Sequence, residues 1–322
     1  MELFLTTLSR MGFLFIFLAC GYLICKLKLI PDNSQKVLSK LENMLFIPAL
    51  MLGTFMNQFT VEKLGTAGRI LILSVILEII IIPLAIVISG LIYGKGYLKK
   101  IATYGLSFAN FGFMGNAVMQ ELFPEIFLEY TVFTLPLWIF IMLWGVPYLL
   151  MADDGEKKLT LLQRLKPLLN PMLIAMLVGM ILGLSGISSY VPAFCTDAID
   201  TMGSLMSPIA MILTGITVAN SSIVTLLSKK RVYLLSVIRL LAFPLVFMGI
   251  FSLVPTGAVI DQTFLITATA AISMPLGLNT IVVPGAYGKD TTDAASMALI
   301  SHAMSIVTIP LIFMLFTLIF GT

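Results

Sequence analysis

The chain has 322 residues, of which 59% are hydrophobic and 11% charged, and its mean hydropathy is +1.06. This composition excludes a soluble globular domain, in which about half of the residues are apolar and about a quarter are charged. The apolar runs lack the period-two alternation of a membrane barrel, so helices remain as the spanning elements. The net charge of +3 is not clustered into a patch for nucleic acid.

Apolar runs between charged or Pro/Gly-rich breaks predict an all-α membrane protein with ten transmembrane helices. In chain order they cover residues 8–24, 37–55, 70–93, 101–123, 126–151, 171–187, 198–219, 232–254, 262–283 and 294–320. The polar segment 152–170 is too short to fold alone and is interpreted as a cytoplasmic linker. We therefore expect a first five-helix repeat over 1–151 and a second over 171–322.

The loops between these helices alternate in charge. Most of the 19 basic residues fall in or beside the odd-numbered loops: Lys26, Lys28, Lys36, Lys40, Lys95, Lys99, Lys100, Lys157, Lys158, Arg164, Lys166, Lys229, Lys230, Arg231 and Lys289. Even-numbered loops carry acidic residues, with Lys63 and Arg69 as their basic exceptions. The positive-inside rule makes the odd loops cytoplasmic, which predicts a multi-pass cell-membrane protein with both termini extracytoplasmic.

The two halves share landmarks in the same order. Pro48 in the second helix corresponds to Pro208 in the seventh, and Asn116 in the fourth to Asn279 in the ninth. Because five helices is an odd number, the halves must insert with opposite orientations. An inverted repeat of this kind is typical of secondary transporters, whose sites lie at discontinuous helices near the midplane.

The fourth and ninth helices each contain residues that interrupt a helix at mid-span. The fourth has Gly112 and Gly115 between two asparagines, and the ninth has Pro275 and Gly277. Proline removes a helical hydrogen bond, and glycine tolerates the opened backbone. The exposed N-termini of the half-helices favour an anionic carboxylate. Ordinary kinks with asparagines bonding between helices are the alternative.

These residues, from 110 to 115, from 275 to 277 and from 284 to 288, resemble the auxin efflux carrier family, which includes plant auxin carriers and bacterial malate and malonate permeases. The resemblance implies a fold similar to sodium/proton antiporters and bile-acid symporters, with broken helices four and nine crossing. It also implies a scaffold of helices one, two, six and seven, a mobile core of helices three to five and eight to ten, and it allows a homodimer. Asn110 matches the family asparagine that contacts the substrate carboxylate, whereas Ala109 stands where plant carriers have proline.

Several polar residues inside the predicted spans are candidates for function. Glu78 and Arg239 each lie five residues before a proline at equivalent repeat positions, which suggests an ion pair in the core that protonation of Glu78 loosens during transport. The alternatives are a purely structural pair or a glutamate that reaches the membrane interface. His302 suits a proton relay or a hydrogen-bonded packing role. Glu42 with Asn43, and Asp200, could face a substrate cavity or a membrane interface. The expected substrate-binding residues are Asn110, Gly112, Gly115, Asn116, Pro275, Gly277, Asn279 and Asn43.

The sequence thus predicts alternating-access transport of a small organic anion such as malate, malonate or an auxin-like carboxylate. No catalytic residue, metal site or cofactor is expected, and the coupling ion is left open between H⁺ and Na⁺. The alternatives are a sodium-coupled symporter of the bile-acid type and a channel. An intramembrane hydrolase is disfavoured because no HExxH, GxSxG or paired intramembrane aspartate motif is present.

Overall fold

The computed structural model describes residues 2–151, 170–220, 222–257, 259–286 and 292–321, and over these ranges the chain is helical with no strand. The predicted linker lies outside these ranges except for Asn170, which caps the next helix by accepting a hydrogen bond from the Leu173 N–H at 3.0 Å. Tyr287, Gly288 and Lys289, which the sequence analysis also used, lie outside them as well.

The first half contains helices of very different lengths. They are α1 (Glu2–Lys26), α2 (Ser34–Leu41), α3 (Ile47–Gln58), α4 (Leu64–Tyr93), α5 (Tyr97–Ser107), α6 (Asn116–Leu122) and α7 (Phe127–Phe140). Three π-helical segments join or extend them, η1 (Glu42–Phe46), η3 (Phe111–Gly115) and η5 (Ile141–Leu150), together with the 3₁₀ turns η2 (Val61–Lys63) and η4 (Pro124–Ile126).

The second half has a similar mixture. Its helices are α9 (Pro171–Ser185), α10 (Ala193–Ser204), α11 (Met206–Ala219), α12 (Ile223–Leu227), α13 (Lys230–Val237), α14 (Phe243–Phe251), α15 (Gln262–Ser273), α16 (Asn279–Ala286) and α17 (Thr292–Phe320). The 3₁₀ turn η7 (Ile187–Tyr190) follows α9, and the π-helical segment η8 (Ile238–Ala242) joins α13 to α14.

Seven helical stretches in the described residues are long and apolar enough to cross a membrane. They are Phe4–Lys26, Ser34–Gln58, Val61–Tyr93, Pro124–Leu150, Ala193–Ala219, Lys230–Phe251 and Thr292–Phe320. Of the other three predicted spans, one is the shorter apolar helix α9, and two are interrupted at mid-length. A multi-pass helical membrane protein is therefore confirmed, whereas the count of ten spans and the inverted repeat stay predictions.

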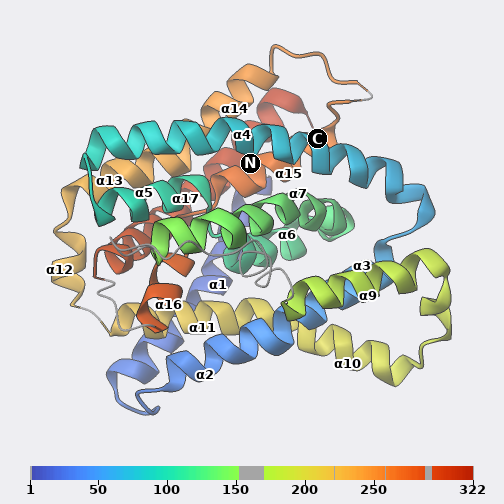
Figure 1. The fold of residues 1–322 in the computed structure, drawn as a ribbon, viewed down its shortest axis with the longest axis horizontal. Helices are drawn as coiled ribbons and strands as arrows, with labels where there is room; N and C mark the ends of the chain where they lie inside the picture. Colours follow the sequence, from blue (N-terminus) through green and yellow to red (C-terminus); the bar gives the residue numbers. More distant parts are fainter. Residues whose placement is uncertain (1, 152–169, 221, 258, 287–291, 322) are drawn as a thin grey trace.

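The helices form two packed groups (Figure 1). In the lower part of the view, α3 packs against α9 and α10, and α2 lies against α11. In the upper part, α4 packs against α5 and α7, while α17 packs against α12, α13 and α15. The long helix α1 packs against both α11 and α17. The first group, with α1, has the membership expected for the scaffold, but the division into scaffold and mobile core stays a prediction.

Glycines bring the backbones of the lower group into direct contact. A Cβ added to Gly215 of α11 would lie 2.0 Å from the Leu18 carbonyl oxygen of α1, and one added to Gly21 would lie 2.1 Å from the Ile212 carbonyl oxygen. Gly183 of α9 meets the Phe59 carbonyl oxygen in the same way, at 2.5 Å. Small residues allow this close packing in membranes, where burial of apolar surface alone does not drive helices together.

Replacing Gly215 by valine is expected to destabilise the protein by about 1–3 kcal/mol, because the new side chain overlaps the α1 backbone. The midpoint of thermal unfolding in detergent measures the change. Gly12→Val on α1 is the control, since no atom lies within 4 Å of a Cβ added there. Equal midpoints for the two variants would contradict this packing.

Candidate functional site

Both interrupted helices open at the positions that the sequence indicates. The helix α5 ends at Ser107 and is followed by extended backbone at Phe108, with φ −118° and ψ 95°. The helix α15 ends at Ser273 and is followed by extended backbone at Met274, with φ −69° and ψ 149°. Pro275 accounts for the second break because it has no N–H to donate. The first break forms without a proline, with alanine at position 109.

The two open segments pair with each other. Ala109 and Leu276 form an isolated antiparallel bridge, and the Asn110 N–H donates to the Pro275 carbonyl at 2.7 Å. A Cβ added to Gly277 would lie 2.7 Å from the Phe108 carbonyl oxygen, so only glycine fits there without a shift. We call this contact between residues 108–110 and 274–277 the crossover.

Arg239 binds the carbonyl ends of both first half-helices. Its guanidinium donates from Nη1 to the Leu106 carbonyl at 2.8 Å and from Nη2 to the Ala271 carbonyl at 3.2 Å, with Nε 3.4 Å from the Met274 carbonyl oxygen. The side chain is 2% exposed. The last carbonyls of a helix lack intrahelical partners and carry partial negative charge, so a buried cation with several donors satisfies them.

The direct ion pair between Glu78 and Arg239 is not formed in this conformation. The four ion pairs among the described residues do not include it, and Glu78 Oε2 is buried without a hydrogen-bond partner. The sequence indicated Arg239 as a functional candidate but did not indicate its partners. Two helix breaks must leave free carbonyls, and these could have been predicted as the partners of a nearby arginine.

His302 and Ser301 of α17 support the crossover from one side. The His302 Nδ1 donates to the Ala298 carbonyl at 2.7 Å, so Nε2 is the acceptor for the Asn110 side-chain amide at 2.9 Å. The Leu276 N–H donates to the Ser301 hydroxyl at 3.2 Å. The structure therefore places His302 beside the expected substrate-binding asparagine, in a neutral form that orients the amide.

The second half-helix of the first break begins at Phe111, directly after Asn110. The Asn110 carbonyl accepts from both the Met114 N–H, at 3.1 Å, and the Gly115 N–H, at 3.0 Å. The N–H groups of residues 111–113 consequently have no partner within the helix. Arg239 thus covers the negative ends of the first half-helices, whereas the N–H groups at the start of this second half-helix carry the partial positive charge of a helix N-terminus.

Aromatic residues that the sequence analysis did not select pack around these ends. A Cβ on Gly112 would lie 2.6 Å from the Trp138 ring, and one on Gly115 would lie 2.0 Å from the Tyr130 hydroxyl. That hydroxyl donates to the Phe111 carbonyl at 3.0 Å. These close contacts explain why both glycines are needed, although their spacing gives no indication of the rings.

The remaining candidates divide between the crossover and the lower group. Asn279 donates to the Tyr104 hydroxyl at 3.1 Å, and Asn116 is 3% exposed at the start of α6. Asn43 instead donates to the Ser39 carbonyl of its own helical stretch at 2.7 Å. Its neighbour Glu42 is fully buried on η1, with both carboxylate oxygens unpartnered.

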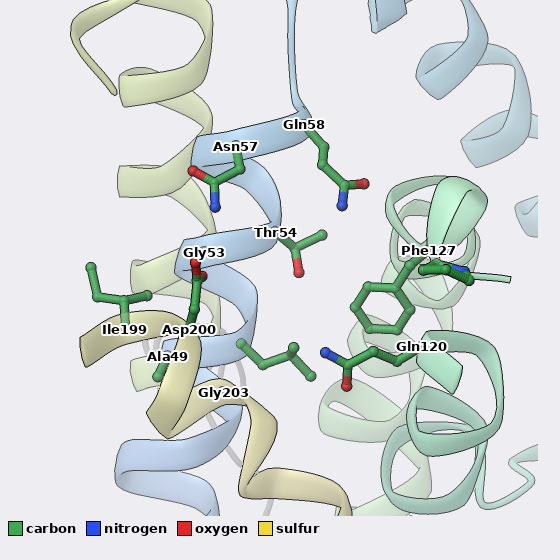
Figure 2. A pocket seen from close by; sticks show the side chains of 12 residues that line it. Ala49, Gly53, Thr54, Asn57, Gln58, Gln120, Phe127, Ile199, Asp200 and Gly203 are labelled. Atoms are coloured by element: carbon green, nitrogen blue, oxygen red, sulfur yellow. The ribbon is translucent and has the colours of Figure 1, made fainter. Parts of the chain in front are cut away.

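A cavity of about 270 Å³ lies beside α6, the helix that follows η3 after the first break (Figure 2). One wall is formed by α3 and α10, and the other by α6, η4 and α7. Its polar lining residues are Thr54, Asn57, Gln58, Gln120 and Asp200. Of the sequence candidates, the cavity thus contains Asp200 and not Asn43.

Arg239→Gln is expected to lower the stability by about 3 kcal/mol or more, because buried carbonyls at both breaks lose their donor. Arg239→Lys should recover only part of this loss, since an ammonium lacks the planar fork that reaches several carbonyls. Thermal unfolding in detergent measures both variants. Arg231→Gln, at an exposed position on the adjoining helix α13, is the control; a similar loss there would refute the assigned role.

The comparisons with known proteins agree with this architecture. A comparison with curated proteins found no match. A family model described as membrane transport protein matches residues 6–313, nearly the whole chain. This family is one of transporters of the auxin efflux carrier type and not of enzymes. The chain therefore belongs to the membrane transport protein family of auxin efflux carrier type.

Proposed function

We propose that the chain is a secondary transporter of small carboxylates that binds its substrate at the crossover and works by alternating access. The observation that carries the proposal is the division of charge at the two breaks. Arg239 is bonded to carbonyls of the first half-helices, so it is not the anchor for an incoming anion in this conformation. The N-terminal ends of the second half-helices are the complementary positive site.

A carboxylate has the right chemistry for this position. Its two oxygens accept hydrogen bonds from backbone N–H groups such as those of residues 111–113, without requiring a basic side chain. The Asn110 amide has two N–H groups, of which one is directed to His302 and the other is left for substrate. His302 holds this amide because its own Nδ1 proton is bound to the Ala298 carbonyl.

The crossover is closed in this conformation, which supports a mechanism that needs movement. Asn110 and Asn116 are 2% and 3% exposed, and the rings of Trp138 and Tyr130 leave no space beside the two glycines of η3. A substrate can reach the amide only if the group of helices carrying the crossover shifts relative to its surroundings. We propose that this group is the mobile core, sliding or rocking against a scaffold of α1–α3 and α9–α11.

The membrane topology, the substrate class and the energy coupling are inferred from the sequence. The two halves form an inverted five-helix repeat in the cell membrane with both termini extracytoplasmic, as the loop charges favour. The substrate is a compound such as malate, malonate or an auxin-like carboxylate, and transport is linked to protons or driven by the membrane potential. Each unit of net charge moved then contributes about 2.3 kcal/mol per 100 mV.

Asn110→Ala is expected to weaken carboxylate binding about tenfold or more, because a hydrogen bond to a charged acceptor contributes about 1.5–3 kcal/mol. The measurement is a ligand-induced thermal shift with malate, malonate, lactate, citrate and indole-3-acetate, followed by uptake of the best ligand in proteoliposomes. The unliganded unfolding midpoint shows whether the variant is folded.

Asn43→Ala is the matched control, because that amide bonds only within its own helical stretch. It should bind and transport as the unaltered protein does. Equal affinity of Asn110→Ala and the unaltered protein would refute the crossover site. Flux that neither saturates nor shows counterflow would favour a channel, and uptake that requires sodium would favour a sodium-coupled symporter.

A further inference from the structure

The cavity beside α6 contains polar groups that the proposed carboxylate site does not use. Thr54 is 7% exposed, its hydroxyl has no hydrogen-bond partner among the described residues, and it lines the cavity. The Gln58 Oε1 is likewise buried without a partner. Buried polar groups in folded proteins are nearly always hydrogen-bonded, so the Thr54 hydroxyl and the Gln58 oxygen have hydrogen-bonding capacity left for a bound ligand.

The lining of this cavity is oxygen-rich and negative. Among the described residues, Asp200 is its only ionisable lining residue, and the other polar groups are the hydroxyl of Thr54 and the amides of Asn57, Gln58 and Gln120. No lysine or arginine of the described ranges lines it. An anion entering this space would be repelled by the carboxylate, so the site differs in its ligand from the crossover.

The basic residues of the segment between α3 and α4 and of α4 itself pair with acids other than Asp200. Lys63, which follows α3 closely, is 3.0 Å from the Glu129 carboxylate, and Arg69 is paired with Asp261. Asp200 itself makes no hydrogen bond or ion pair among the described residues, and its electrostatic neighbour is another acid, Asp197. Asp200 is solvent-exposed and no positive side chain among the described residues pairs with it, so a cation in the cavity would meet an unpaired carboxylate.

A glycine allows the carboxylate to lie against the wall of the cavity. A Cβ added to Gly53 would be 2.8 Å from the Asp200 Oδ1, so a side chain at that position would displace the carboxylate. In Figure 2, Asp200 is drawn against Gly53, and Thr54, Gln58 and Gln120 extend from the two walls toward the space between them. The Asp200 carboxylate, the Thr54 hydroxyl and the amide side chains of Gln58 and Gln120 thus line one volume.

We propose that this cavity binds a small monovalent cation, with Asp200 as the charged ligand and Thr54, Gln58 and Gln120 as neutral oxygen ligands. Carboxylate, hydroxyl and amide oxygens are the donors that hard cations prefer. A single carboxylate balances one positive charge, and the described residues hold no cluster of three His, Cys, Asp or Glu side chains suited to a multivalent metal. The cavity has room for several waters at about 30 Å³ each, so the cation keeps part of its hydration.

The position of the cavity gives the cation a mechanical role. Gln120 lies one turn beyond Asn116 on α6, about 6 Å along the helix that follows the first break. Thr54 and Asp200 lie on α3 and α10, in the other group of helices. A cation bound between them links the two groups, so its binding stabilises this conformation relative to one in which α6 has moved away.

The test is a thermal unfolding titration of the purified protein with NaCl, LiCl or KCl, with choline chloride replacing each salt to keep the ionic strength constant. Sodium or another small alkali cation is expected to raise the unfolding midpoint by about 2 °C or more over choline. Asp200→Asn should abolish this difference. Asp197→Asn, on the same helix but outside the cavity lining, should retain it.

Variants at two further positions separate the cation site from a general effect of charge. Gly53→Ala keeps Asp200 but displaces its carboxylate and should weaken the cation response. Thr54→Val should do the same, with the response restored by Thr54→Ser.

An equal midpoint in alkali and choline salts for the unaltered protein, or an unchanged cation response in Asp200→Asn, would overturn the proposal. Asn110→Ala should retain the cation response, which distinguishes failure of this site from failure of the carboxylate site.

Discussion

Two openings of the backbone at membrane depth are the constraint on which the rest of this structure depends. Water is absent from the hydrocarbon region, so each free N–H or carbonyl there costs several kcal/mol unless protein surrounds and pairs it. The structure meets this cost by placing the two openings against each other, with Asn110 bonded to Pro275 and Leu276 bonded to Ser301. Arg239 then supplies donors for carbonyls from both.

The same arrangement separates the partial negative and partial positive charges of the interrupted helices. The arginine is committed to the negative helix ends, and the positive ends remain beside an asparagine that a histidine orients. The glycines of η3 and Gly277 permit the close packing that this geometry needs. A feature that would be unstable in an isolated helix thereby supports the proposed binding site in a member of a transport family.

The sequence predicted the helical membrane class and the location of both breaks. Pro275 acts locally on the backbone of the second break, whereas the first break opens at residues 108–110, just before Gly112 and Gly115. It did not predict which side chains would satisfy the opened groups, since such partners depend on tertiary contacts. Equivalent repeat positions suggested that Arg239 would pair with Glu78, but the carbonyls of Leu106 and Ala271 are its hydrogen-bond partners. Asn43 and Asp200 were both candidates for a cavity, and only the contact between α10 and α3 distinguishes them.

The most direct test of the central claim is an experimental structure of the protein with its best carboxylate ligand bound. Our account predicts carboxylate oxygens within hydrogen-bonding distance of the Asn110 amide and of N–H groups at the start of the second half-helices. Arg239 should remain bonded to the carbonyls of the first half-helices. A carboxylate bound directly to Arg239, or held only in the Asp200 cavity, would contradict the account.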